Sequence, residues 1–393
     1  MSPTKTCLRS TLAALLPCLL FGACAVGEEA PARPKVKIRY RMPSIVMMAH
    51  ADWPKDPKHH DAMAKLVVSH GFNVVEGGVD VLDVCRKHGL MVRLGGDQAT
   101  LNAAQKLRDD PAVFGYFISD RRKRSSFPLF AEIARVFEKA DPTHPTIFIN
   151  RANWNEFGDF TKQVQPMLLD FYHYHAMPRR HPERYYLYLL MFRDLGQKNG
   201  IPVMRCTSSS SSPGQLRQTI YTSLAYGVTG FHFWTPWIFA HAKDKNGNAQ
   251  LKDGKLNTYI TLPHLTAIAK EVRWMSPVLA DCRSVAMHHT DPLPIGGQKA
   301  PKDAWCQPSG AQLLVGVFEG EKGGDYLLVT NKHAGQKQQA TLSLDATAVE
   351  KMDKKTGKWQ KLSLAPVKGK QTVKLELAPG DGELLKVTRT KKK

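Results

Sequence analysis

The chain has 393 residues, and 42% of them are hydrophobic, which is enough for one or two domains with a large buried core. Its 55 Lys and Arg residues outweigh 35 Asp and Glu residues and give a formal net charge of +20. Such an excess either attracts an acidic polymer or covers the surface with lysine and has no specific partner. No nucleic-acid recognition motif accompanies the charge, so nucleic acid is not an expected partner.

Residues 1–25 are predicted to be a signal peptide. A short basic start precedes the apolar stretch Leu12–Phe21, which is too short to span a bilayer, and Ala23-Cys24-Ala25 fits a small-x-small cleavage site. The protein is therefore expected to be exported, to the periplasm or the cell exterior. The alternative is a lipoprotein modified at Cys24, the one route by which we expect attachment to a membrane. Residues 26–44 are expected to form a linker that leads into the first domain.

Export places the chain in an oxidising compartment. Four cysteines lie outside the predicted leader: Cys85, Cys206, Cys282 and Cys306. Cys282 and Cys306 lie in one strand-and-loop region and are candidates for a disulfide, whereas the other two are expected to be buried thiols. No pair has the short spacing of a zinc site, and the sequence predicts neither a metal nor another cofactor.

Residues 45–276 alternate short apolar runs with amphipathic segments. The runs predict eight strands, at Ile45–Ala49, Phe72–Glu76, Leu90–Leu94, Val113–Ser119, Thr146–Asn150, Leu168–Tyr172, Pro202–Cys206 and Gly230–Trp234. Eight strands separated by helices predict an α/β fold of the TIM type, a closed (β/α)8 barrel. A doubly wound open sheet is the alternative, but no glycine-rich phosphate loop follows any of the strands.

The segments between these strands carry the spacing and the end signals of helices. Ser212-Pro213 is a capping residue followed by a proline at the first helical position. His70-Gly71-Phe72 and His88-Gly89-Leu90 each end a helix with glycine and lead into a strand. Two apolar helix faces are expected to pack on the barrel, and they are formed by Phe127, Phe130, Ile133, Ala134 and Phe137, and by Leu216, Ile220 and Leu224.

Residues 277–393 change to a period of two and predict a small antiparallel β-sandwich. The expected strands are Leu313–Phe318, Tyr326–Thr330, Ala340–Leu344, Val349–Asp353, Thr372–Leu377 and Leu384–Val387. Gly, Lys and Asp residues form the turns between them. Residues 290–310 are rich in proline and glycine and are expected to form a loop.

Functional side chains in a (β/α)8 barrel lie at the carboxyl ends of the strands. Carboxylates at these ends can bond sugar hydroxyls, and flat aromatic rings can stack on the apolar faces of sugar rings. The positions predict a carbohydrate substrate. The candidate catalytic residues are Asp120, Asp170 and Glu76, and the candidate substrate-binding residues are His50, Asp52, Arg93, Arg121, Asn150, Trp154, Tyr172, His173, Arg205, His232, Trp234 and Trp237.

Cleavage of a glycosidic bond generally uses two carboxyl groups, one protonated and one ionised. Asp120 is the best candidate because it ends an apolar strand, Asp170 is its best partner, and Glu76 is the third candidate. The alternative for Asp120 is a structural ion pair with Arg121 or a neighbouring arginine. A metal site built from His173 and His175 is not favoured, since no ligand spacing supports it.

With these residues in place, the chain resembles the glycoside-hydrolase-type barrels with a C-terminal β-sandwich that occur in exported bacterial proteins. The resemblance covers most of the mature chain. It rests on Val113–Asp120 with the helix that follows, on Asp170-Phe171-Tyr172, on Leu224–Gly230 and on Leu377–Gly382.

In such relatives the fourth strand commonly ends Asp-Glu-Pro, whereas this chain has Asp120-Arg121-Arg122. The resemblance then implies one of two functions. In alpha-galactosidase-like barrels a strand-four Asp is the nucleophile and a strand-six Asp is the acid/base, which corresponds to Asp120 and Asp170 here. Otherwise the barrel has lost catalysis and only binds glycan. Arginine forks match carboxylate or sulfate, so Arg121 and Arg122 also fit an anionic sugar.

Overall fold

The structure is a computed structural model, and it describes residues 37–120, 123–151, 154–172, 182–208, 212–234, 238–310, 312–367 and 369–390. The predicted signal peptide, with Cys24, lies outside the described residues. No helix in the described ranges is both long enough and apolar enough to cross a membrane.

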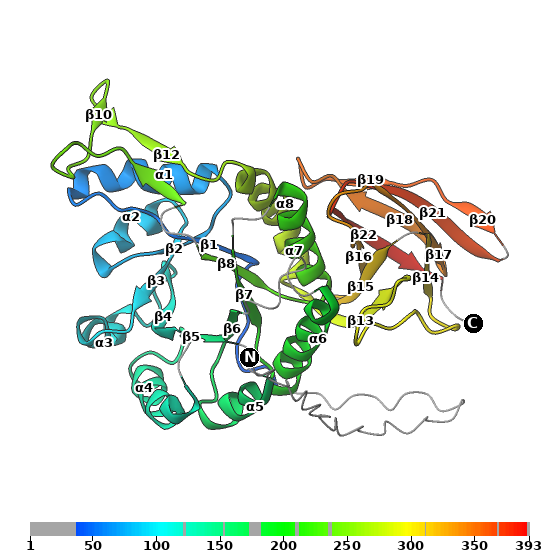
Figure 1. Cartoon of the computed structure of the whole chain (residues 1–393), viewed down its shortest axis with the longest axis horizontal. Coiled ribbons are helices and arrows are strands. Elements are labelled where there is room, and N and C mark those ends of the chain that lie inside the picture. The colour runs from blue at the N-terminus through cyan, green and yellow to red at the C-terminus, as the bar shows by residue number, and fades with distance from the viewer. Residues whose placement is uncertain are drawn as a thin grey trace, which may run out of the picture. The chain divides into compact units, whose positions relative to one another are not determined.

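Eight parallel strands form a closed barrel in the order β1 to β8. Figure 1 shows these strands surrounded by helices. The barrel predicted from the sequence is confirmed, and its strands are β1 Val46–Ala49, β2 Val74–Glu76, β3 Met91–Gly95, β4 Val113–Asp120, β5 Thr146–Arg151, β6 Leu169–Tyr172, β7 Val203–Ser208 and β8 Gly230–Trp234.

The helices follow the strands as the sequence signals predict. The expected apolar face of α4 is buried, and Pro213 begins α7, where the Gln215 side chain accepts a hydrogen bond from the Ser212 backbone N–H at 3.4 Å. The bounds are α1 His60–Ser69, α2 Leu82–Lys87, α3 Gln98–Ala104, α4 Phe127–Ala140, α5 Trp154–Gln163, α6 Pro182–Asn199, α7 Pro213–Ala225 and α8 His264–Leu279.

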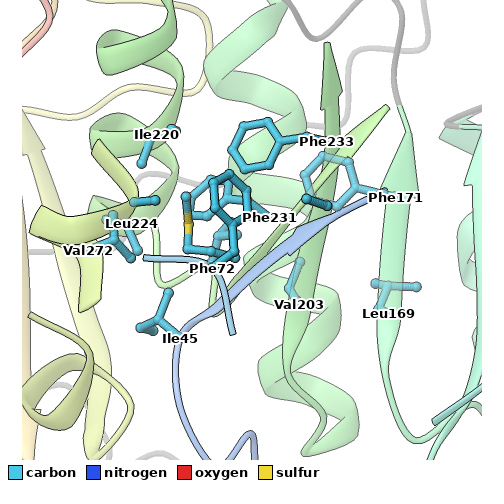
Figure 2. Packing of buried hydrophobic residues seen from close by; sticks show 14 of the residues in the cluster. Ile45, Phe72, Leu169, Phe171, Val203, Ile220, Leu224, Phe231, Phe233 and Val272 are labelled. Atoms are coloured by element: carbon cyan, nitrogen blue, oxygen red, sulfur yellow. The ribbon is translucent and has the colours of Figure 1, made fainter. Parts of the chain in front are cut away.

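Most barrel strands contribute to two apolar layers, because successive side chains point to opposite faces. The inner layer fills the base of the barrel and contains Val46, Met48, Val74, Phe114, Ile147, Leu168 and Met204. The outer layer lies between strands and helices, where Phe171 of β6 stacks on Phe192 of α6 with ring centroids 3.7 Å apart. Figure 2 shows part of this outer layer, to which β8 contributes Phe231, α7 Leu224 and α8 Val272.

An extra segment between β8 and α8 was not expected from the sequence. It contains the short strands β9 Phe239–His241, β10 Leu251–Lys252, β11 Lys255–Leu256 and β12 Thr258–Ile260, paired as β9 with β12 and β10 with β11. Ala51, just after β1, bridges to Phe239 of β9, so this segment lies against the exit of the first strand.

The C-terminal residues form two antiparallel sheets around a second apolar core, in agreement with the predicted sandwich. One sheet has the order β13-β15-β16-β22-β18-β19 and the other β14-β17-β21-β20. The strands are β13 Cys282–His289, β14 Cys306–Gly310, β15 Leu313–Gly320, β16 Asp325–Asn331, β17 Gln338–Leu344, β18 Ala346–Met352, β19 Trp359–Lys361, β20 Ala365–Val367, β21 Lys370–Leu377 and β22 Gly382–Arg389.

Two of these strands lie at or inside the stretch expected to be a loop. β13 ends just before it, and β14 contains Pro308 and pairs only with β17 in its sheet. Proline is tolerated in an edge strand because one side needs no backbone donor. Composition therefore indicated a loop where an edge strand forms.

Cys282 and Cys306 are both free thiols, and the disulfide considered for them does not form. Cys282 belongs to the six-stranded sheet and packs toward the barrel core, whereas Cys306 is buried between the two sheets. Their positions on different sheets and in different cores explain why closeness in sequence does not bring them together.

The barrel and the sandwich share a packed boundary. Helix α7 contacts β15 and β16 of the sandwich. Gly316 of β15 allows this approach, because a Cβ there would lie 2.4 Å from the carbonyl oxygen of Ala225. The expected division at residues 276 and 277 falls inside the last turns of α8, which continues to Leu279.

Candidate functional site

The polar residues of the candidate site replace apolar residues on the inward face of the barrel strands. Leu169 and Phe171 of β6 pack outward in the layer under the helices, so Asp170 between them points into the barrel. The same alternation places Glu76 of β2, Arg93 of β3 and His232 of β8 above the inner apolar layer. These positions lie toward the carboxyl ends of the strands, where barrel active sites form.

Glu76 is held by two basic side chains. Its Oε2 pairs with Nδ1 of His50, and its Oε1 lies 3.1 Å from Nη2 of Arg93. Although burial raises the pKa of Glu76, the hydrogen bond from His50 and the charge of Arg93 lower it to about 2. Glu76 is therefore a carboxylate near neutral pH, with its side chain 39% exposed.

Arg93 is almost fully buried and connects several groups of the site. Its guanidinium lies over the ring of Phe117, 4.3 Å from the centroid, and its Nη1 lies 3.5 Å from Nδ1 of His232. The ring of His232 in turn places Nε2 3.3 Å from Nε2 of His50. Burial, followed by the charges of Arg93 and His50, holds the pKa of His232 well below its usual range, so this imidazole is neutral.

Asp170 is completely buried, and its Oδ2 lies 3.5 Å from Nδ1 of His232. Neither carboxyl oxygen has a hydrogen-bond partner of normal geometry among the described residues. Burial raises the pKa of Asp170 to about 7, against the opposing influence of Arg93 and the backbone N–H of Cys206. A large share of the carboxyl group, about half at pH 7, is therefore protonated near neutral pH, which is the state that a general acid requires.

Asp120 and Asp170 are linked by strand register through β5. Asp120 is in register with Ile149 of β5, and Ile149 is in register with Asp170. Ser119 is in register with Phe148, which packs outward on Phe130 of α4, so Asp120 shares the inward face with Ile149. Two strand spacings separate the Cα atoms of the two aspartates by about 10 Å.

Two residues predicted to bind substrate are engaged elsewhere. Arg205 lies on the outward face of β7, where Nη1 donates to the hydroxyls of Tyr185 of α6 and Ser223 of α7 at 3.0 and 2.9 Å. Its assignment to the site is therefore wrong, because the strand turns this side chain toward the helices. Asp52 accepts from Lys243 Nζ at 3.0 Å and fastens the segment after β8 to the exit of β1.

The remaining predicted residues lie outside the described residues or have undescribed side chains. Arg121, His173 and Trp237 belong to the first group. Asn150, Trp154, Tyr172 and Trp234 lie near the expected strand ends, but only their backbones are described. All of them remain predictions from the sequence.

Two aromatic residues near the site were missed. Trp53 donates from Nε1 to the backbone oxygen of Glu76 at 2.9 Å, and its position three residues after His50 was the available signal. Phe117 faces Arg93, but register shifts within β4 break the period of two that would have revealed its direction.

Within the described ranges, no group of three or more His, Cys, Asp or Glu side chains has a geometry that could hold a metal ion. The site instead offers a buried carboxyl group of raised pKa, a carboxylate, a buried guanidinium and a pair of imidazoles. These groups are suited to moving protons and to binding hydroxyl or anionic groups.

No protein-family model and no curated protein matches the chain. Among solved structures, it is similar in fold to a putative alpha-galactosidase/melibiase from Bacteroides fragilis, at 11% identity over 88% of this chain and 79% of that chain, with a TM-score of 0.48. It is also similar to a GH27 β-L-arabinopyranosidase from Geobacillus stearothermophilus, at 9% identity over 89% of this chain and 97% of that chain, with a TM-score of 0.49.

A third similar structure is an endo-β-1,4-mannanase from Thermotoga petrophila, at 10% identity over 90% of this chain and 99% of that chain, with a TM-score of 0.44. At these identities and TM-scores the likeness carries no residue role to this chain. The fold follows from the chain's own strand pairing, and the site from its own contacts.

Proposed function

We propose that this protein is a hydrolase of glycosidic bonds in a poly- or oligosaccharide. In this proposal Asp170 is the general acid that protonates the leaving oxygen. Asp120 is the ionised carboxylate that acts on the sugar carbon or on water. His50, Arg93 and His232 line the same site, and anionic sugars are among the candidate substrates because Arg93 and Arg121, which follows Asp120 in the sequence, carry positive charge.

The observation that carries the proposal is the state of Asp170. Its carboxyl group is fully buried and lacks a normal hydrogen-bond partner among the described residues, and burial raises its pKa to about 7. Enzymes that cleave glycosidic bonds need one carboxyl group kept protonated and a second one ionised nearby. Asp120, two strands away and linked to Asp170 through the register of β5, is the proposed second carboxyl group.

The proposal is tested with wild type, Asp120→Asn and Asp170→Asn on a panel of neutral and acidic polysaccharides and of 4-nitrophenyl glycosides. Loss of either carboxylate is expected to lower kcat/KM at least about a hundredfold, the lower range for a general acid or base. Asp291→Asn, at an exposed position on the sandwich, serves as a control that keeps wild-type activity. Activity that survives in both site variants would refute the assignment.

A second candidate is a barrel that binds glycan without cleaving it. The complete burial of Asp170 favours it, since a general acid must reach the leaving oxygen. Under this alternative the wild type shows no turnover on the panel, while both variants keep the glycan affinity of the wild type. The two candidates therefore differ in the first measurement made on the wild type.

We propose further that the protein is exported through its N-terminal signal peptide. The basic start, the short apolar stretch and the small-residue cleavage motif support this proposal. Expression of the full chain, followed by N-terminal sequencing of the secreted product, distinguishes cleavage near Ala25 from lipid attachment at Cys24.

A further inference from the structure

Four side chains of the site lie in a row, each within 3.5 Å of the next, and we call them the Asp–His–His–Glu array. In spatial order they are Asp170, His232, His50 and Glu76. The separations are 3.5 Å from Asp170 Oδ2 to His232 Nδ1 and 3.3 Å from His232 Nε2 to His50 Nε2. The last link is the close pair between His50 Nδ1 and Glu76 Oε2.

The neighbours of the array allow one consistent assignment of its protons. A neutral imidazole has one donor nitrogen and one acceptor nitrogen. Arg93 can only donate, and its Nη1 approaches His232 Nδ1, so this nitrogen is the acceptor and Nε2 carries the proton. His232 then donates to Nε2 of His50, which leaves the His50 proton on Nδ1, directed at the carboxylate of Glu76.

The same assignment accounts for Asp170. Its Oδ2 lies 3.5 Å from His232 Nδ1, the same distance as Nη1 of Arg93, so the two donors would share one lone pair. An ionised carboxylate would oppose this acceptor, whereas a protonated one can donate to it. The other groups that act on Asp170 are the guanidinium of Arg93 from β3 and the backbone of Cys206 from β7, and its neighbour in register on β5 is apolar Ile149.

We infer that the Asp–His–His–Glu array is a proton relay that connects the buried carboxyl group of Asp170 with the half-exposed carboxylate of Glu76. Three protons move one step each: from Asp170 to His232 Nδ1, from His232 Nε2 to His50 Nε2, and from His50 Nδ1 to Glu76. Asp170 becomes a carboxylate, Glu76 a carboxylic acid that exchanges with solvent, and both rings change tautomer. The reverse movement returns the proton.

This inference rests on the proposed function in that it assigns His232, His50 and Glu76 to the protonation of the same acid. In this view they are positioning residues, because they act through Asp170 and not on the sugar. The role of Glu76 also differs from that of a third catalytic carboxylate. It accepts and releases the proton at the end of the array that solvent can reach.

The first test measures the tautomers in the full-length wild-type protein labelled with 15N-histidine, by NMR at pH 7. We expect a proton on Nε2 of His232 and on Nδ1 of His50, with resonances identified by His232→Gln and His50→Asn. A proton on Nε2 of His50, or two protons on either ring, would overturn the relay. The measurement needs no substrate, so it holds whether or not glycan is cleaved.

The second test follows exchange of the Asp170 proton with D2O through its infrared carboxylic C=O band, identified by its loss in Asp170→Asn. Glu76→Gln cannot take up the proton, and we expect exchange to slow at least about tenfold, which corresponds to about 1.4 kcal/mol of barrier. Asp52→Asn also removes one carboxylate near β1 but leaves the array intact, and it should exchange like the wild type.

Equal exchange rates in Glu76→Gln and the wild type would contradict the inference. If Glu76→Gln fails to fold because Arg93 loses its partner, the wild-type tautomers still decide the question. The expected tautomers together with no glycan cleavage would refute the proposed function and leave the relay standing. Glycan cleavage together with the opposite tautomers would support the proposed function and refute the relay.

Discussion

The raised pKa of Asp170 results from its position on the inward face of β6. Its neighbours Leu169 and Phe171 are fully buried in the outer layer, which directs Asp170 into the barrel above Leu168 and Met204. A carboxyl group in such surroundings has lost its water, and the backbone N–H of Cys206 and the charge of Arg93 only partly offset that loss, so its charged form is disfavoured. Strand β6 thus contributes both to the outer apolar layer, through Leu169 and Phe171, and to the candidate site, through Asp170.

This burial predicts how stability depends on pH. The pKa of Asp170 in the folded protein, about 7, is raised from its ordinary 3.8. The contribution of Asp170 to the free energy of unfolding is therefore fully present below about pH 3.8 and is lost as pH rises through 7. Asp170→Asn has no such loss. The free energy of unfolding of Asp170→Asn, relative to that of the wild type, should therefore increase between pH 4 and pH 8, by roughly 4 kcal/mol at the most.

Glu76 provides a matched comparison of opposite sign. Its folded pKa, about 2, is lowered from 4.5, so its contribution is present above about pH 4.5 and is lost as pH falls toward 2. Glu76→Gln should therefore be less stable than the wild type at pH 7 and approach it below pH 4.5. Denaturant unfolding at several pH values measures both variants, and parallel curves for the two would contradict the assigned environments.

At the scale of elements, two glycine turns show how helices return the chain to the barrel. Gly71 follows α1 with φ +86°, and Gly89 follows α2 with φ +68°. Both adopt the left-handed conformation that ends a helix and that side chains other than glycine rarely adopt. They differ in their surroundings. A Cβ on Gly71 would lie 2.7 Å from the backbone N of Lys270 in α8. A Cβ on Gly89 would have no atom within 4 Å.

The two turns predict different costs for the same substitution. Gly89→Ala should lose about 1 kcal/mol of stability, the cost of the left-handed conformation alone. Gly71→Ala must in addition displace the backbone of α8, and we expect a loss of about 3 kcal/mol, in the range of other severe backbone conflicts. Thermal and denaturant unfolding compare the two. Equal losses would mean that α8 does not pack closely on this turn.

At the scale of the whole chain, a cluster of charges links the barrel to the sandwich. Arg217 of α7 donates from Nη2 to Asp381 Oδ1 at 2.7 Å and pairs with Glu271 of α8. Lys354 of the sandwich donates to the other oxygen of Asp381 at 2.7 Å. The Gln218 side chain donates to the backbone oxygen of Lys332, which adds a contact across the same boundary. Asp381 therefore joins cations from both parts.

Removal of Asp381 should weaken this boundary. Its side chain is 11% exposed, and Asp381→Ala leaves Arg217 and Lys354 partly buried with one partner fewer each. We expect a loss of about 3 kcal/mol, the lower range for breaking a buried ion pair. In calorimetry, we also expect the single unfolding transition to broaden or split.

Asp291→Ala is the matched control for this prediction. Asp291 pairs with Lys299 at 2.6 Å, but its side chain is 70% exposed, so the change should cost no more than about 0.5 kcal/mol. If both variants lose the same small amount, the charges at the boundary do not hold the two parts together.

The sequence by itself determined the barrel strands, the main helices and most of the sandwich. These features depend on local patterns: apolar runs of strand length, helical spacing such as that of Phe127–Phe137, and glycines at helix ends. Each pattern reports how a short segment buries its own surface. The same information identified Asp120, Asp170 and Glu76 as candidates, because each lies in or directly after an apolar run of strand length.

Only the tertiary structure decided which side chains meet. His50 and His232 come from β1 and β8, which become neighbours only when the barrel closes. Strands buried on both faces are apolar on both, so hydrophobicity does not give the direction of a polar residue, and Arg205 points to the helices while His232 points inward. Closure of the barrel and the face of each strand are set by long-range pairing, which no local pattern contains.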